Sequence, residues 1–166
     1  MAILRILGID PGSRKAGVGI IDVDGNRVRH VHHHVIRCDK GEFTSRLGIL
    51  FEELSSIIST YKPTTAAVED VFVSKNVSSA LKLGQARGAL IAACCHANLD
   101  VSTYSPTAIK LATVGHGRAE KAQVQHMIKV LLKPPLPLPE DAADALAACL
   151  CHAHHIPMQK RLGKIL

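Results

Sequence analysis

The order of the predicted strands and helices constrains the fold of this chain more than any other feature. The first third holds three strand-like segments, joined by the Gly-rich stretch P-G-S-R-K-A-G and by a hairpin turn at Asp24-Gly25-Asn26. Helical and strand-like patterns alternate after them. This order predicts an α/β fold, a mixed five-stranded sheet with helices on both faces. We expect strands at about 3–10, 17–23, 27–37, 66–72 and 101–104, and helices at about 46–61, 78–97, 119–132 and 140–154.

Individual residues indicate several helix boundaries. Apolar residues recur at three- and four-residue intervals across 46–61, which predicts an amphipathic helix that packs on the sheet, and Pro63 ends it. Ser105 and Pro106 are typical of an N-cap and a first helical position, so a further helix begins there. The helix at 78–97 is rich in Ala, Gly and Leu. Its small residues allow another helix to approach closely, either within the domain or across a dimer.

Four carboxylates occupy positions that an α/β fold can bring together. Asp10 and Glu69 each close a short apolar run, which is typical of a strand that emerges from a core. Asp141 and Asp144 stand three residues apart at the start of an Ala-rich helix, so they share one face of it. Each acid alone has an ordinary explanation, as a turn residue before Pro11 or as a charge favoured by the helix dipole. One shared site explains all four positions at once.

A shared site of four acids needs cations, because carboxylates without matching bases repel one another. Carboxylate oxygens favour Mg²⁺ or Mn²⁺ over Zn²⁺. Two such ions could activate a water and stabilise the departing 3′ oxygen in phosphodiester hydrolysis. The expected metal ligands and catalytic residues are therefore Asp10, Glu69, Asp141 and Asp144.

Composition limits the partners and the compartment. With 166 residues, 47% of them hydrophobic, the chain suits one domain, which we expect at 1–157, followed by a basic tail at 158–166. The net charge of +6 favours a polyanion, and three Phe, two Tyr and no Trp leave phosphates as the main contacts. The N-terminus lacks a signal-peptide pattern, no apolar run would span a membrane, and the five cysteines suit reduced thiols. We expect a cytoplasmic protein without a membrane partner.

Two His-rich segments raise the possibility of other metal sites. In H-V-H-H-H-V-I, strand alternation puts His32 and His34 on one face and His33 on the other, so an exposed polar strand is favoured over a metal site. In C-L-C-H-A-H-H (149–155), Cys and His fall at i+3 or i+4, a spacing that could bind Zn²⁺. No distant C-x-x-C accompanies this cluster, so buried structural cysteines are the favoured interpretation.

Five motifs extend in order over nearly the whole chain: G-I-D-P-G-S-R (8–14), V-E-D-V-F-V-S-K-N (68–76), S-A-L-K-L-G-Q-A-R-G (79–88), A-E-K-A-Q-V-Q-H-M (119–127) and D-A-A-D-A-L-A (141–147). Together they closely resemble the RuvC family of Holliday-junction resolvases, the crossover junction endodeoxyribonucleases. The resemblance implies an RNase H-like fold and a homodimer that binds a four-way DNA junction. It also implies Mg²⁺-dependent symmetric nicking of two opposing strands in recombination and repair, with ligatable ends and a branch-migration motor as partner.

The resemblance also implies roles for individual residues in cleavage. It makes Asp10 and Glu69 the central metal ligands, completed by the two aspartates of the last helix. Lys110 and Lys121 match basic positions near the scissile phosphate, where they could hold the strand or steady developing charge. An exposed helix face is an equally weighted explanation for these two lysines.

Further residues are expected to contact the junction. Phe72 matches an aromatic residue that wedges or stacks at the junction centre, although an ordinary strand core residue is the alternative. Arg14 and Lys75 are the other expected DNA-binding residues. Asp70 departs from the family pattern, in which a neutral amide is commoner beside the catalytic glutamate. Strand alternation turns Asp70 away from the metals, so it is excluded from the site.

Three other functions compete with a resolvase. The motif G-I-D-P-G-S also resembles the phosphate loop of sugar kinases and actin-like ATPases, but those proteins need two such domains to enclose a nucleotide. A catalytically idle junction-binding module would keep the basic surface without needing four converging acids. A metal-dependent exonuclease or RNase H of related fold would share the acids and differ in substrate.

Overall fold

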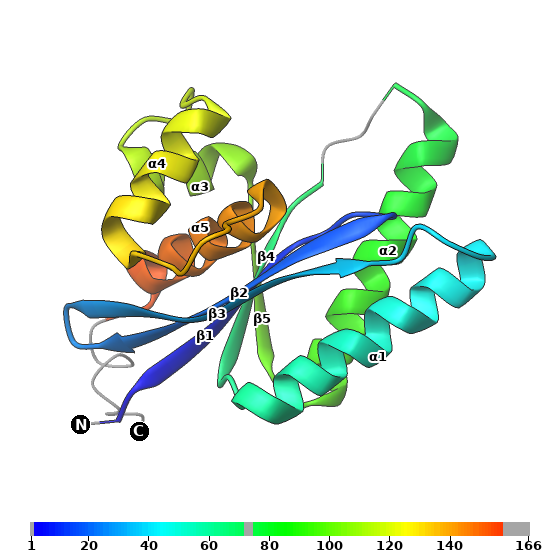
Figure 1. Cartoon of the computed structure of the whole chain (residues 1–166), viewed down its shortest axis with the longest axis horizontal. Coiled ribbons are helices and arrows are strands. Elements are labelled where there is room, and N and C mark those ends of the chain that lie inside the picture. The colour runs from blue at the N-terminus through cyan, green and yellow to red at the C-terminus, as the bar shows by residue number, and fades with distance from the viewer. Residues whose placement is uncertain (1, 72–74, 158–166) are drawn as a thin grey trace.

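The computed structural model describes residues 2–71 and 75–157. Its five strands form one sheet in the order β3-β2-β1-β4-β5 (Figure 1). The first three strands are an antiparallel meander, and β4 and β5 continue the sheet parallel to β1. The expected mixed five-stranded sheet is therefore confirmed. The strands are β1 (Leu4–Asp10), β2 (Lys15–Asp24), β3 (Arg27–Arg37), β4 (Thr65–Glu69) and β5 (Asp100–Tyr104).

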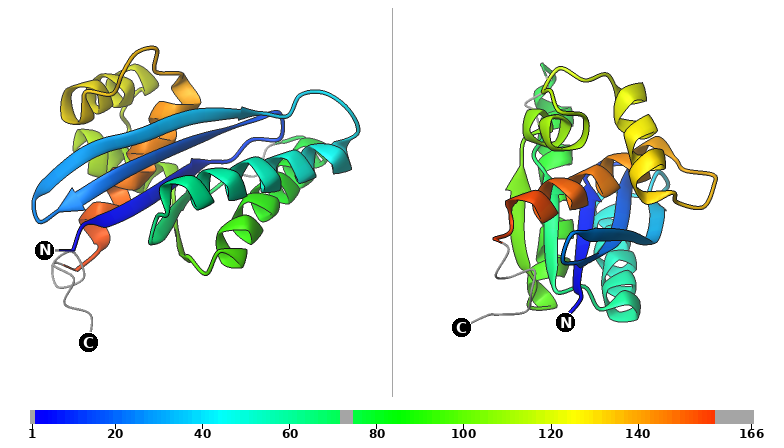
Figure 2. Two further views of the ribbon diagram at one scale, coloured as in Figure 1. Left: turned by 60° about the horizontal axis from the view of Figure 1, so that its bottom comes forward. Right: turned by 90° about the vertical axis from the view of Figure 1, so that its left-hand side faces the viewer.

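Helices cover both faces of this sheet, as the sequence predicts (Figure 2). One face carries two long helices, and the other carries three helices of which the last lies directly on the strands. Successive side chains of β1 point to opposite faces, so the strand contributes to both cores: Ile6 packs on the three-helix side and Leu7 on the two-helix side. The helices are α1 (Phe43–Tyr61) and α2 (Val77–His96) on one face, and α3 (Pro106–Val114), α4 (Lys121–Leu132) and α5 (Glu140–His155) on the other.

Two predicted boundaries differ from the structure by three residues, the largest differences among the elements. The helix α1 starts at Phe43, three residues before the apolar pattern does, after Gly41 with a positive φ of 86°. The strand β4 ends at Glu69 and not at about 72, because its partner β5 ends at Tyr104, where Ser105 caps α3. One further hydrogen bond, from the Asp70 N–H to the Tyr104 carbonyl (2.8 Å), joins the two chain segments just beyond the last paired residues of β4 and β5. The expected N-cap at Ser105 and first helical position at Pro106 are confirmed.

The histidines of β3 are more buried than the sequence predicts. His32 stacks on Tyr61 of α1 with ring centres 4.4 Å apart, whereas His33 faces the other side and donates from Nε2 to the Pro137 carbonyl (3.0 Å). His30 reaches His33 on that side (2.9 Å) because the pairing of β2 with β3 shifts register between Ile20 and Ile21. The alternation is confirmed, but an exposed strand is wrong for His32 and His33, which are half-buried.

Among the residues described, no helix combines the length and the apolar character needed to cross a bilayer.

Candidate active site

Two acids meet at the carboxyl edge of the sheet because their strands are neighbours. Asp10 is the last residue of β1 and Glu69 the last residue of β4. These strands are parallel, and Ile9 pairs with Val68, so the two acids extend from the same edge. In open α/β sheets this edge is where sites form.

Two glycines allow α5 to bring the other two acids to that edge. A Cβ atom at Gly17 would overlap the carbonyl oxygen of Asp141, and one at Gly8 would overlap the carbonyl oxygen of Ala145. Gly17 is the ladder partner of Asp10. The first turn of α5 therefore lies against the end of β1, with Asp141 and Asp144 beside the strand acids.

The electrostatics of the four acids show how closely they are grouped. Burial raises the pKa of Asp10, and the negative charges of Glu69, Asp144 and Asp141 raise it further. Burial and then the charge of Glu69 raise the pKa of Asp144 to about 7. Burial also raises the pKa of Glu69, against a hydrogen bond with Asp10 and the charges of Lys121 and Lys110. Without a cation, the cluster therefore retains protons at neutral pH.

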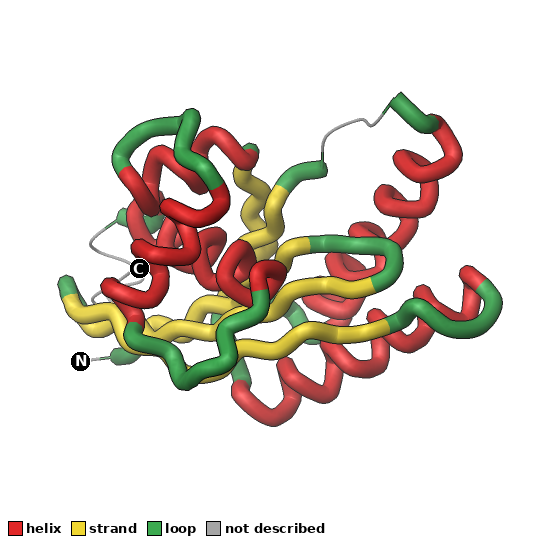
Figure 3. Tube along the Cα trace, turned by 45° about the horizontal axis from the view of Figure 1, so that its top comes forward, coloured by secondary structure: helices red, strands yellow, loops and turns green. Residues whose placement is uncertain are grey.

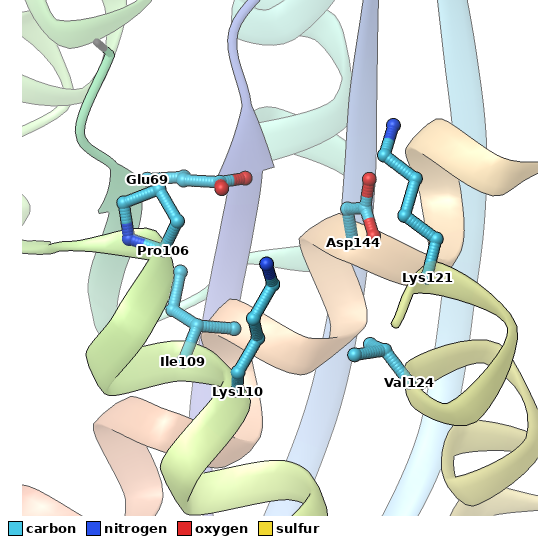
Figure 4. Close-up of a pocket in the computed structure, with 7 residues that line it drawn as sticks. All are labelled: Glu69, Pro106, Ile109, Lys110, Lys121, Val124 and Asp144. Atoms are coloured by element: carbon cyan, nitrogen blue, oxygen red, sulfur yellow. The ribbon is translucent and has the colours of Figure 1, made fainter. Parts of the chain in front are cut away.

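Two lysines line the pocket that opens beside these acids. The pocket has a volume of about 160 Å³, and Figure 4 shows Lys110 rising between Glu69 and Asp144, with Lys121 beyond Asp144. The structure thus brings both expected lysines to the acids, from α3 and from the start of α4. The pocket lining is Glu69, Pro106, Ile109, Lys110, Lys121, Val124 and Asp144.

Two charged residues at the rim of this site were missed by motif reasoning. Lys15 forms an ion pair with Asp141 (3.0 Å), and Glu140 forms one with Lys121. The position of Lys15 at the start of β2, opposite the end of β1, is the sequence signal that could have revealed it. Glu140 is simply the neighbour of a predicted ligand. Both lysines are largely exposed, so these ion pairs lie at the solvent side of the site.

The donor chemistry of the four acids fits hard divalent cations. Carboxylate oxygens suit Mg²⁺ and Mn²⁺, and binding of such an ion would release the protons that mutual repulsion retains. In the part of the chain that the structure describes, no three His, Cys, Asp or Glu residues are arranged as ligands of one ion. The acids are a grouped set rather than a closed ligand shell.

The other expected DNA-binding residues lie around the site with different degrees of support. Arg14 is exposed in the turn between β1 and β2, and Lys75 is exposed just before the start of α2. Phe72 lies outside the described residues. Asp70 forms an ion pair with Arg87 of α2 (2.8 Å), which agrees with its exclusion from the metal cluster.

The Cys and His residues of α5 form a buried polar network. The thiol of Cys149 lies within hydrogen-bond distance of two carbonyl oxygens, that of Ile6 (3.6 Å) and that of Gly19 (3.4 Å), and can share its one proton between them. Thr65 donates to the carbonyl of Asp100, so it accepts from His152 Nε2 (2.9 Å), and His152 Nδ1 accepts from the Tyr104 hydroxyl (2.7 Å). These bonds join α5 to β1, β2, β4 and β5, which supports the structural interpretation of the cluster.

Comparisons with known proteins agree with the motifs. The family model described as crossover junction endodeoxyribonuclease RuvC matches residues 6–152. The protein of that name from Alkalilimnicola ehrlichii is 53% identical over 96% of this chain and 97% of its own length. The structure of Thermus thermophilus RuvC in complex with a Holliday junction substrate is similar, with a TM-score of 0.84, 32% identity and 97% coverage of both chains.

The same comparisons identify the fold. The yeast mitochondrial Holliday junction resolvase Ydc2 matches with a TM-score of 0.68 over 96% of this chain and 82% of its own, at 13% identity, a level that concerns the fold alone. The expected RNase H-like fold is thereby confirmed. With a family model that covers most of its length and relatives above half identity, this chain belongs to the RuvC family of crossover junction endodeoxyribonucleases.

Proposed function

We propose that this protein is a structure-specific DNA endonuclease that resolves Holliday junctions in homologous recombination and repair. The grouping of four carboxylates at one sheet edge, beside Lys110 and Lys121, is the observation that carries the proposal. Family membership supports the substrate, since the Thermus relative was captured with a Holliday junction. An idle binding module would gain nothing from acids held at such electrostatic cost.

Each part of the site has a role in this reaction. The metal ligands would be Asp10, Glu69, Asp141 and Asp144, and they would hold two Mg²⁺ ions, with Mn²⁺ as a substitute. When bound, these ions polarise the phosphate and lower the pKa of the attacking water. The strand ends and the packed helix α5 keep the four carboxylates in fixed positions. Lys110 and Lys121 hold the scissile phosphate in the pocket and offset the charge that develops on it.

Strand-resolved cleavage of a mobile synthetic four-way junction tests the proposal. A linear duplex and an RNA–DNA hybrid of the same sequence serve as comparison substrates, each with Mg²⁺ and with chelator. We expect paired nicks at symmetric positions, on the junction alone and with metal alone. Equal cutting of the duplex would make the protein a general nuclease, and cutting of the hybrid would make it an RNase H. Binding without cutting would support the idle module.

Symmetric nicking requires two active sites, and α2 offers a surface for a homodimer. Val77 and Leu81 are 72% and 63% exposed, although both are apolar. Gly84 and Gly88 continue the same face of the helix, and a Cβ atom at either would meet nothing within 4 Å. Glycine inside a helix costs about 1 kcal/mol relative to alanine, and this chain does not itself need the space. Close packing of α2 against α2 of a second copy would bury the two apolar side chains and use the space at the two glycines. A two-fold dimer also suits a two-fold junction.

Introducing a charge on this surface should separate the subunits. We expect Leu81→Arg to convert a dimer into a monomer, because a desolvated charge would lie in the apolar contact. Sedimentation velocity measures the change. Val130→Arg on α4 is the control, since Val130 is also apolar and 50% exposed, and it should stay dimeric. A wild-type protein that sediments as a monomer when bound to a cleaved junction would contradict the dimer.

The remaining parts of the proposal rest on family membership and on charge. We place the nuclease domain at 1–157 and assign the basic segment 158–166, which lies outside the described residues, to the chain's phosphate contacts. The protein would act in the cytoplasm, with a branch-migration motor as a partner.

A further inference from the structure

We infer that Arg46 and Lys82, which both lie over the ring of Phe43, bind a backbone phosphate of the junction outside the cleavage site. This inference deepens the proposed function and rests on it. Neither basic residue belongs to the pocket of the four acids, and they come from different helices, α1 and α2. The three residues are called the Phe43 cluster below.

The geometry of the Phe43 cluster places two positive charges around one aromatic ring. The guanidinium carbon of Arg46 lies 5.0 Å from the ring centre of Phe43, and the ammonium nitrogen of Lys82 lies 5.8 Å from it. Cation–π attraction stabilises each charge, but the two cations also repel each other. Among the described residues, neither forms an ion pair with a carboxylate. An anion bound beside both cations would offset this repulsion.

The guanidinium of Arg46 is held in place while part of its donor capacity is unused. Its Nε atom is buried and has no hydrogen-bond partner among the residues that the structure describes. Packing against Phe43, rather than an acid, fixes the side chain. A fixed guanidinium loses little conformational entropy when it binds a phosphate oxygen, and its planar fork matches phosphate geometry.

The surroundings of the cluster also favour an anion. Phe43 is the first residue of α1, at its positive end, and Lys82 lies in the second turn of the neighbouring helix α2 (Figure 3). Neither helix has an acidic residue in its first turn, although the N-cap residue of α1 is Glu42. The partial positive charge at the start of α1 adds to the two full charges, and the Glu42 carboxylate offsets part of the total.

The cluster connects to the cleavage site along the edge of the sheet. Asp10 ends β1, and the turn that follows it contacts Cys38 through two bonds, from the Cys38 N–H to the Arg14 carbonyl (2.8 Å) and from its thiol to the Ser13 carbonyl (3.6 Å). Burial raises the pKa of Cys38, and the nearby charge of Arg46 opposes that rise. A DNA strand that leaves the four acids and passes over this turn would reach the cluster next.

The double variant Arg46→Gln with Lys82→Gln tests the inference in the full-length protein. The control is Arg29→Gln, an exposed arginine of β3 at the opposite end of the sheet. Junction affinity is measured in chelator at several salt concentrations. We expect the double variant to bind about tenfold more weakly, with a salt slope smaller by about 1 to 2, because each lost phosphate contact removes about 0.9 from the slope. Cleavage at saturating junction should stay within about twofold of wild type, since only binding shared by ground and transition state is lost.

Ethylation interference on the same junction identifies the phosphate. In the wild type, ethylation of one or two phosphates away from the nick should weaken binding, and the double variant should be insensitive at those positions alone. An unchanged salt slope with every interference position retained would overturn the inference. So would dissociation of the dimer, which would mean that the cations face an acid of a second copy. Inorganic phosphate should weaken junction binding only as much as any salt of the same ionic strength does. Loss of junction binding at micromolar phosphate would overturn the inference, because it would indicate a site for free phosphate. If wild-type protein cleaves no junction at all, the proposed function fails first.

Discussion

The variant Asp10→Asn should lose junction cleavage and keep junction binding. Asp10 is the most central acid of the cluster, since the charges of Glu69, Asp144 and Asp141 all act on it. Asparagine keeps the shape of the side chain but removes the negative charge that a divalent cation needs. Metal ions supply several kcal/mol of transition-state stabilisation, so we expect the cleavage rate to fall by about 10³-fold or more. Strand-resolved cleavage and gel-shift titration of one junction measure the two effects separately.

A matched control for this variant is available just beyond the end of the neighbouring strand β4. Asp70 follows Glu69 directly in the sequence but forms an ion pair with Arg87 of α2. Asp70→Asn should therefore keep cleavage within a few fold of wild type, because a half-exposed ion pair contributes about 0–1 kcal/mol. Retained cleavage in Asp10→Asn would remove Asp10 from the metal site. Loss of cleavage in Asp70→Asn would instead show that Asp70 had been wrongly excluded.

The second large effect concerns the stability of the metal-free protein. Asp144→Asn should raise the melting temperature in chelator at neutral pH, by about 5 °C if the change is near 2 kcal/mol. Asp144 is partly exposed, so we expect a smaller gain in stability than its full pKa shift would give. The ionised cluster is unfavourable in the folded state, and asparagine removes one of its charges. With saturating Mg²⁺ the wild type should instead have the higher melting temperature, because only the wild type gains stability from binding the metal with all four carboxylates.

The pH dependence of this effect follows from the direction of the shift. In the folded protein, burial and Glu69 raise the pKa of Asp144 from 3.8 to about 7. The folded state therefore binds more protons than the unfolded state between these values, and its stability falls as pH rises from about 4 to 7. The advantage of Asp144→Asn should be absent at pH 4 and complete above pH 7. Thermal melts in chelator across this range measure it, and an advantage independent of pH would point to packing rather than charge.

Local patterns in the sequence predict most of this fold, and contacts distant in sequence account for the differences. The apolar runs ending in Asp10 and Glu69 locate two strand ends and the site between them. The sequence pattern extends β4 to about residue 72, whereas the strand ends at Glu69, because the partner strand and not the local pattern decides where pairing stops. The register shift that sets His30 beside His33 has the same origin. Such pairing is invisible in a linear pattern.

The same distinction applies to the candidate site. All four acids could be found because each stands at a recognisable strand end or helix start. The ion pairs of Lys15 with Asp141 and of Lys121 with Glu140 could not, since their partners are brought together only by the position of α5 on the sheet. The Phe43 cluster likewise needs the packing of α1 against α2.

The packing of α5 against the strands limits which parts of such an enzyme can vary. At one end, Gly8 and Gly17 let its backbone touch the strands, and at the other, His152 is bonded to Thr65 and Tyr104. Contact of backbones limits sliding, and directional hydrogen bonds limit rotation about the helix axis. The packing of α5 on the sheet, rather than the surrounding loops, therefore sets the spacing of the acids. Residues in the surrounding loops can therefore change without moving the four acids relative to one another.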